Sequence, residues 1–416
     1  MDKKAKQTSS IIIILCWAAY TAAYIGRLNF NAYIEPIRDQ IGATKTEMGL
    51  VSSFFFFSYG AGQLIHGILS RKYNTRYSVA IALIGSALVN VGMTLCPGVS
   101  SMKYVWLLGG VFQSILWSSI IKTLSDRLPD EMLSKAVVVM STTAALGTFL
   151  SYGLASLFSA FKVDYRMIFF VPAALLMLAG VLWFILIGKA DRFAKTADAP
   201  AYVPKPKQRP ALTPVFVFTS LFLVFAAISN GFIKDGVTTW TPSILKESYG
   251  MPESLSIFIT VLLPLIAIFG ATLSATLYKR LKSTSKLDAM FYGIEAAVLV
   301  AVFLLARART TTGAPNSPVF LIVLFGFSAM LMAAVNNVIT SIIPLTMRDK
   351  MDSGLLAGVL DTFCYVGSTM STALLGFIAD HGSWNGVFLC LMLFGAVACL
   401  LCTLSVFIEK KHPTIS

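Results

Sequence analysis

The chain has 416 residues, of which 56% are hydrophobic and only 13% are charged, and its formal net charge is +13. This composition is far more apolar and less charged than that of a soluble globular domain, so it indicates a membrane protein surrounded by lipid. In a soluble protein the positive charge would suggest nucleic acid as a partner. Here no nucleic-acid partner is expected, because the basic residues gather in loops between apolar runs.

Twelve apolar runs are long enough for a spanning helix, which needs about 20 mostly apolar residues. We therefore predict an all-α membrane protein with twelve transmembrane helices. In chain order the helices are expected near residues 11–34, 48–69, 78–96, 104–124, 136–160, 167–188, 213–234, 255–277, 287–306, 318–343, 355–379 and 386–408.

The Lys and Arg residues alternate between the two sides of the predicted membrane. One side holds 22 of the 33: Lys3, Lys4, Lys6, Arg71, Lys72, Arg76, Arg127, Lys135, six between Lys189 and Arg209, Lys279, Arg280, Lys282, Lys286, Arg348, Lys350, Lys410 and Lys411. The other side holds Arg38, Lys45, Lys103, Lys162, Arg166, Lys246, Arg307 and Arg309. Because the richer side is normally cytoplasmic, both termini are predicted in the cytoplasm, as an even number of spans also requires.

The longest polar interval, residues 188–214, is rich in Pro, Ala and Lys and follows the sixth run. It predicts three parts. These are an N-terminal six-helix bundle over 1–188, a cytoplasmic linker over 189–212 and a C-terminal six-helix bundle over 213–416.

An internal repeat supports this division. Three residues of the first half recur in the second at an offset of 206 or 207 residues, so that Arg27, Pro36 and Glu47 correspond to Lys234, Pro242 and Glu253. Two six-helix halves related by an axis along the membrane normal are typical of the major facilitator superfamily, in which the substrate lies between the halves. The first and seventh spans would each bring one cation to that place.

The first span, YTAAYIGRLNF with Tyr20, Tyr24 and Arg27, resembles that of the organophosphate:phosphate antiporters, the bacterial carriers of glycerol phosphate and hexose phosphates. Matching segments follow in the same order: SYGAGQLIHGILSRKYNTR, GGVFQSILWSSIIKTLSDRLP, KDGVTTWTPSILKE and AGVLDTFCYVGSTMSTALLGFIADHGSWNGVF. The resemblance implies a carrier of the bacterial inner membrane that takes a small anionic solute, with phosphate as its counter-substrate.

Five positions depart from the pattern of that family. The basic residue beside the first-span Arg is Leu28, the second-span Lys is Gln63, the fifth-span His is Ala144, the second-half Arg is Lys234, and the acidic residue of the loop after span two is Arg71. The set of basic residues is therefore smaller than in the family, although two central cations remain.

Arg27 shares one helical face with Tyr20, Tyr24 and Asn31, because these residues are spaced by four, three and four. A charge near the bilayer centre costs about 2.5–3.5 kcal/mol on insertion scales, so it normally faces a partner or a watery cavity. We expect the guanidinium to bind an anion through paired hydrogen bonds, with the tyrosines beside it. The alternative is an Arg that extends from its helix end to the lipid headgroups.

Lys234 has Asn230 and Thr238 four residues on either side, and we expect Lys234 and Asn230 to bind the substrate. The alternative is a local ion pair with Asp235. Helix geometry argues against that pair, because successive residues point about 100° apart.

Tyr59, Gln63 and His66 share a face of the second span, and the first two are expected to bind substrate hydroxyls together with Tyr365. His66 titrates in the physiological range and is a candidate for proton coupling, the alternative being a hydrogen bond between helices.

Three further charged residues are candidates for coupling or gating. Asp361 is predicted to pair with Lys234 or Lys122 when no solute is bound, and Glu295 lies inside the ninth span. Lys122 stands near the cytoplasmic end of the fourth span, where a gate or a structural ion pair is expected.

No Walker-type glycine loop, metal-ligand cluster or nucleophile–base pair occurs in the sequence, so we expect no enzymatic activity, no metal and no cofactor. The leading hypothesis is secondary transport of a small organic anion by alternating access, as organophosphate/phosphate antiport. One alternative is a proton-coupled symporter of a sugar acid or another carboxylate. Another is a membrane sensor that does not transport.

Overall fold

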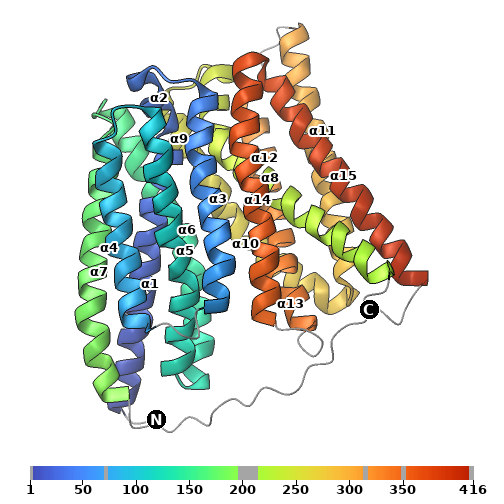
Figure 1. The fold of residues 1–416 in the computed structure, drawn as a ribbon. Coiled ribbons are helices and arrows are strands. Elements are labelled where there is room, and N and C mark those ends of the chain that lie inside the picture. The colour runs from blue at the N-terminus through green and yellow to red at the C-terminus, as the bar shows by residue number, and fades with distance from the viewer. Residues whose placement is uncertain (1–2, 70–73, 195–213, 313–316, 348–352, 412–416) are drawn as a thin grey trace.

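The computed structural model describes residues 3–69, 74–194, 214–312, 317–347 and 353–411. Within these ranges all regular elements are helical, and twelve segments are long and apolar enough to cross a membrane. The predicted all-α class and the twelve spans are therefore confirmed. The long helices run side by side in one bundle (Figure 1).

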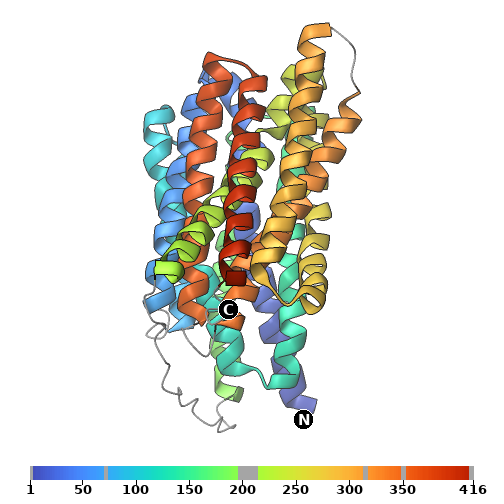
Figure 2. The same ribbon diagram turned by 90° about the vertical axis from the view of Figure 1, so that its right-hand side faces the viewer.

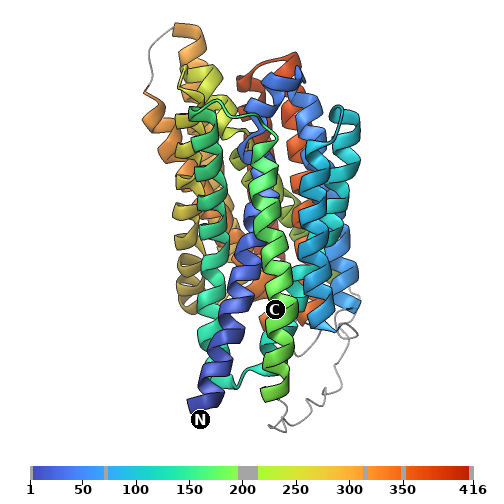
Figure 3. The same ribbon diagram turned by 90° about the vertical axis from the view of Figure 1, so that its left-hand side faces the viewer.

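The first six spans are α1 (Lys3–Ala32), α3 (Lys45–Leu69), α4 (Thr75–Thr94), α5 (Val99–Arg127), α6 (Asp130–Ala160) and α7 (Met167–Ala194). Figure 3 shows α7 and α1 in front. The short helix α2 (Ile34–Ile41) joins α1 to α3 and ends at Gly42, whose φ of 68° is the left-handed conformation that favours glycine. α4 begins after Asn74, whose side chain accepts the backbone N–H of Arg76.

The second six spans are α8 (Pro214–Tyr249), α9 with α10 (Glu253–Thr260 and Leu262–Leu281), α11 (Thr284–Thr312), α12 continued by a π-helix and α13 (Pro318–Asn337, Val338–Ile342 and Ile343–Thr346), α14 (Ser353–His381) and α15 (Trp384–Lys411). Figure 2 shows α15 and α11 in front.

The predicted end of the seventh span is wrong. The seventh span was expected to end at Lys234, but α8 has 36 residues and continues to Tyr249. The apolar run stops at Lys234 because two charged residues follow one another there, yet both remain inside the helix. The helix α7 continues to Ala194, but its membrane-spanning part, Met167–Lys189, agrees with the expected 167–188. Most of the predicted linker, from residue 195 onward, lies outside the described residues.

The bundle has two distinguishable ends. Helices α2 and α9 lie at one end, called here the α2 end, and the start of α1 lies at the opposite end, called the terminal end (Figure 1). α3 therefore runs from the α2 end to the terminal end, and α8 runs from the terminal end to the α2 end.

Close packing joins the two halves where α3 meets α14. A Cβ atom on Gly49 would lie 2.1 Å from the carbonyl oxygen of Thr372, so any side chain at this position would force the helices apart. One turn further along α3, the hydroxyl oxygens of Ser53 and Thr372 are 2.8 Å apart.

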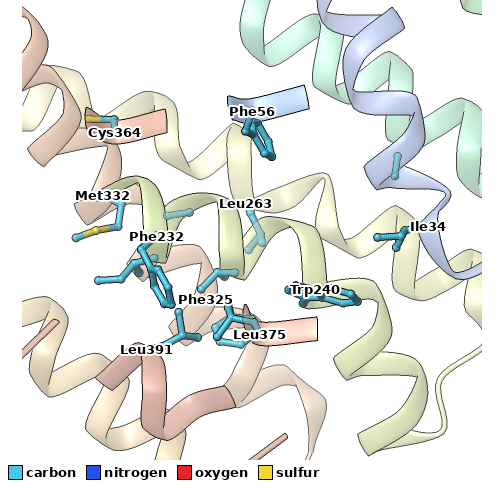
Figure 4. Packing of buried hydrophobic residues seen from close by; sticks show 14 of the residues in the cluster. Ile34, Phe56, Phe232, Trp240, Leu263, Phe325, Met332, Cys364, Leu375 and Leu391 are labelled. Atoms are coloured by element: carbon cyan, nitrogen blue, oxygen red, sulfur yellow. The ribbon is translucent and has the colours of Figure 1, made fainter. Parts of the chain in front are cut away.

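The apolar core of the second half fixes the central part of α8. Phe232 is fully buried and packs among Phe325 of α12 and Leu391 of α15 (Figure 4), and its ring stacks on Phe394 at 3.8 Å between centroids. These contacts hold the turn of α8 that carries Lys234, two residues further on.

Candidate functional site

Arg27 lies among tyrosines of α1 and α3. Its guanidinium carbon is 3.8 Å from the ring centroid of Tyr24 and 5.3 Å from that of Tyr59. The ring of Tyr20 meets that of Tyr24 edge to face at 5.2 Å. The helical spacing of the first span therefore produces the predicted aromatic face with the cation at one end.

No carboxylate neutralises Arg27 within the described parts of the chain, where the ion pairs found within 4 Å involve other residues. An arginine over an aromatic ring gains about 0.5–2 kcal/mol but keeps its full charge. The side chain remains partly exposed. A positive charge inside a span, held by rings and left unneutralised, is suited to receive an anion.

Two aromatic residues connect this region to the second half. The rings of Tyr59 and Tyr365, from α3 and α14, are 4.7 Å apart. The Gln63 amide donates a hydrogen bond of 3.0 Å to the Tyr59 hydroxyl. The structure thus brings Tyr59, Gln63 and Tyr365 together beside Arg27, and their role in substrate binding stays a prediction.

Lys234 is paired with its neighbour. Its Nζ lies 3.6 Å from Oδ2 of Asp235, and the Ser368 hydroxyl of α14 donates to the same oxygen. The argument from helix geometry against this pair is therefore wrong, because the long lysine side chain bends back far enough to reach the carboxylate. The side chain of Lys234 is still 32% exposed, and at 3.6 Å the contact is an ion pair without a hydrogen bond.

Asp361 forms no ion pair with Lys234 or Lys122 in the described structure, so the predicted pairing is absent there. Asp235 takes that place next to Lys234 instead. Asp361 is nevertheless close enough to Lys234 and Arg27 to interact electrostatically with both. Two cations and two carboxylates therefore lie near one another where α1, α8 and α14 meet.

Four other predicted residues lie elsewhere. Asn230 is fully buried and donates to the Met332 carbonyl of α12 at 2.7 Å, so it faces a helix and not the Arg27 cluster. Glu295 is also fully buried and accepts a hydrogen bond of 2.6 Å from Ser328. His66 and Lys122 are half-buried on α3 and α5, nearer the terminal end.

Sequence reasoning missed three contributors. Trp117 of α5 packs against Tyr20 at 4.9 Å, Ser368 holds Asp235, and the Tyr152 hydroxyl of α6 lies 3.5 Å from the Thr238 carbonyl. Trp117 and Tyr152 have no charged residue one or two turns away on the same helical face, so no spacing within one span marks them, whereas Ser368 lies seven residues after Asp361 on one face of α14, a spacing that could have marked it.

Reciprocal ion pairs join the halves at the α2 end. Arg38 contacts Glu247 at 3.0 Å, and Lys246 contacts Asp39 at 2.7 Å. The paired residues are 209 and 207 positions apart. These separations are within three residues of the offset of the internal repeat, as expected for contacts near the axis that relates two similar halves.

A second contact at this end caps the N-terminus of α3. The carboxylate of Asp380, at the end of α14, accepts the backbone N–H groups of Lys45 and Thr46 at 3.1 and 2.6 Å, and the Thr46 hydroxyl at 2.6 Å. These N–H groups begin α3 and have no partner within their own helix. The half that contains α14 therefore caps a helix of the other half, which stabilises closure of the α2 end.

Comparison with known proteins shows which family this chain belongs to. Residues 16–344 match the Major Facilitator Superfamily. The chain belongs to this superfamily. Among its relatives, the glycerol-3-phosphate transporter of Bacillus subtilis (strain 168) is 24% identical over 94% of this chain and 91% of its own length. The hexuronate transporter of the same organism is 24% identical over 91% of this chain and 90% of its own length.

A solved superfamily structure shares the fold. It is a bacterial homologue of the human lysosomal transporter Spinster in an inward-facing and occupied conformation, with a TM-score of 0.75, 14% identity and coverage of 99% of both chains. Identity at this level shows the fold alone. The superfamily's twelve-span arrangement and its membrane location therefore apply to this protein.

The buried Glu35 of α2 should make stability depend on pH. Burial raises the pKa of this carboxyl group, and the opposing effects of Arg38, the Ser243 hydroxyl and Lys246 only partly offset it. The folded state then binds this proton more tightly than the unfolded chain. This stabilisation is complete below the ordinary glutamate pKa and is lost as the pH rises through the raised pKa of the folded state. Each pKa unit between the folded and the unfolded state corresponds to about 1.4 kcal/mol.

We expect the unfolding temperature of the wild type to fall more than that of Glu35→Gln between about pH 5 and about pH 8, because Gln mimics the protonated acid. Thermal unfolding in one detergent buffer series measures both. Asp39 does not interfere: its partial burial is outweighed by hydrogen bonds from Lys246 and Arg38, so its pKa is lowered and it titrates below this range. Equal slopes for the two proteins would contradict the prediction.

Proposed function

We propose that the protein is a secondary transporter of a small organic anion, either a phosphate ester or a sugar acid, that works by alternating access. The observation that carries this proposal is the unneutralised guanidinium of Arg27 among Tyr24 and Tyr59 inside a span. A charge in that position is stabilised when an anion binds it. The position over two rings also argues against extension to the headgroups.

Two relatives narrow the class of solute. One is named for glycerol 3-phosphate and the other for hexuronate, and both solutes carry an anionic group on a hydroxylated carbon skeleton. In our proposal the anionic group binds Arg27, while Tyr24, Tyr59 and Tyr365 meet the hydroxylated part. Lys234 leaves Asp235 and binds the anion instead. Its ion pair with Asp235 is long, at 3.6 Å, and is therefore weaker than a charge-assisted hydrogen bond to the anion.

The contacts between the halves favour a defined direction of access. The α2 end is closed by the Arg38 and Lys246 ion pairs and by Asp380. We place the terminal end, with both termini, on the cytoplasmic side of a bacterial inner membrane, because 22 of the 33 basic residues lie in its loops and tails. Fast reaction of a cysteine at Ala199 with impermeant thiol reagents in intact cells would overturn this orientation.

A counterflow assay tests the function. The purified protein is reconstituted into liposomes loaded with inorganic phosphate, and uptake of radiolabelled glycerol 3-phosphate or glucuronate is compared with uptake into liposomes loaded with chloride. Acceleration by internal phosphate establishes antiport. Binding without flux of either solute under any gradient would leave a sensor as the function and overturn the transport proposal.

Proton symport is the second candidate, and the state of Asp361 favours it. This carboxylate lies inside a span near Lys234 and Arg27 and, among the described residues, forms an ion pair with neither. If it carries the proton, an inward pH gradient should drive uptake by the wild type. Asp361→Asn should then abolish accumulation yet keep solute exchange. Accumulation equal to that of the wild type would exclude this role for Asp361.

A further inference from the structure

A separate cavity of about 430 Å³ lies inside the second half. Its wall is formed by α8, α10, α11, α13, α14 and α15, and it includes the start of α8 and the end of α15, near the terminal end. Arg27, Lys234 and the tyrosines of the central cluster do not line it. A cavity of this size accommodates a small organic molecule.

Asp288 of α11 lines this cavity, and one of its carboxylate oxygens lacks a hydrogen-bond partner among the described residues. The side chain is only 3% exposed, and its buried Oδ1 accepts no hydrogen bond. A buried carboxylate oxygen without a donor is costly, and such groups are normally paired. Helix geometry does not explain the residue, because Asp288 lies four positions after Thr284, beyond the first turn in which a carboxylate meets free N–H groups.

A second acid shares the cavity. Glu409 of α15 accepts a hydrogen bond from the Ser285 hydroxyl of α11, and it is close enough for its charge to act on Asp288. Among its described residues the lining also contains one cation, Lys282, which is exposed at the end of α10. The described part of the lining therefore holds two carboxylates and one lysine, and Asp288 forms no ion pair with any described residue.

The rest of the wall is largely apolar. Phe222 and Leu223 of α8 and Leu356 and Leu360 of α14 are part of the lining. A ligand that matches this cavity has a cationic N–H donor at one end and an apolar body at the other. An ammonium group would give Asp288 the charge-assisted hydrogen bond that it lacks.

We propose that this cavity is a binding site for an organic ammonium compound, with its cationic nitrogen on Asp288 and its apolar body against α8 and α14. The site is opposite in charge preference to the Arg27 cluster and does not depend on the transported solute. A bare metal ion fits less well, because no group of three metal-ligating side chains occurs among the described residues. A proton alone would leave a volume of about 430 Å³ unexplained.

Benzylammonium is the probe, and benzyl alcohol is its neutral counterpart of the same shape. Binding to the purified full chain in nanodiscs is measured by titration calorimetry, with thermal unfolding as a second readout. We expect saturable binding of benzylammonium with at least about ten-fold higher affinity than benzyl alcohol, since a hydrogen bond to a charged group gives a preference of this order. Equal affinity for both compounds would overturn the proposal.

Variants locate the site. Asp288→Asn should weaken benzylammonium binding at least about ten-fold, while Asp164→Asn, which removes an exposed carboxylate at the α2 end, should leave it unchanged. Arg27→Ala should also leave it unchanged, which separates this site from the central one. If Asp288→Asn does not fold, Val359→Phe tests the site by filling the cavity from α14. Wild-type affinity in a folded Asp288→Asn or Val359→Phe protein would contradict the assignment.

Discussion

Arg27→Lys is expected to reduce solute transport by about 10- to 100-fold, because a hydrogen bond to a charged group contributes about 1.5–3 kcal/mol. Lysine keeps the positive charge but loses the planar group that can make two parallel hydrogen bonds to one anion. It also loses the flat contact over Tyr24 at 3.8 Å. Initial uptake rates in proteoliposomes, with equal amounts of inserted protein, measure the effect.

A matched substitution distinguishes loss of the anion site from loss of stability. Arg166→Lys changes the same residue type at an exposed ion pair with Asp164 and should transport like the wild type. Lys234→Arg should be tolerated better than Arg27→Lys, because arginine keeps the charge and also reaches Asp235. If folded and inserted Arg27→Ala transports its anion at the wild-type rate, the site is wrongly placed.

Helical spacing was sufficient to predict which residues of one span share a face in the cluster around Arg27. Tyr20, Tyr24 and Arg27 lie on one helix, so a spacing of four and three residues determines their common face. Tyr59 and Gln63 follow the same rule on α3, and the structure brings both sets together. The physical basis is local: rigid helices fix which residues of one span point the same way.

Contacts that depend on the neighbouring helix were not predictable in this way. Asn230 shares a face with Lys234 by spacing, but α12 is close enough to take up its amide through the Met332 carbonyl. Glu295 is engaged by Ser328 for the same reason. Helical periodicity does not show which of two polar residues meets a helix, because that depends on how the spans are arranged.

The adjacent charges of Lys234 and Asp235 also explain why the seventh span was predicted to be too short. An apolar count treats two adjacent charges as the edge of the membrane, whereas here each charge has a partner inside α8. The internal repeat was the better guide. Its offset of 206 or 207 residues lies close to the 207- and 209-residue separations of the ion pairs across the α2 end.

A disulfide between α3 and α14 is expected to stop transport completely, and a reductant should restore it. Ser53 and Thr372 face one another across the two halves, with hydroxyl oxygens 2.8 Å apart, so cysteines at these positions are close enough to bond. Alternating access requires the α2 end to open. A covalent link there holds the protein in the state closed at the α2 end.

The experiment uses Ser53→Cys with Thr372→Cys in a chain whose six native cysteines are replaced, because Cys364 also lies on α14. Ser78→Cys with Ser119→Cys is the control, since those hydroxyls are 2.9 Å apart but join α4 to α5 within one half. Both pairs should cross-link on oxidation, and only the first should block uptake. The blocked protein should still bind its anion, because the link leaves Arg27 unchanged and closes only the α2 end. Unchanged uptake after complete cross-linking of Ser53→Cys with Thr372→Cys would show that the halves do not separate at this contact during transport.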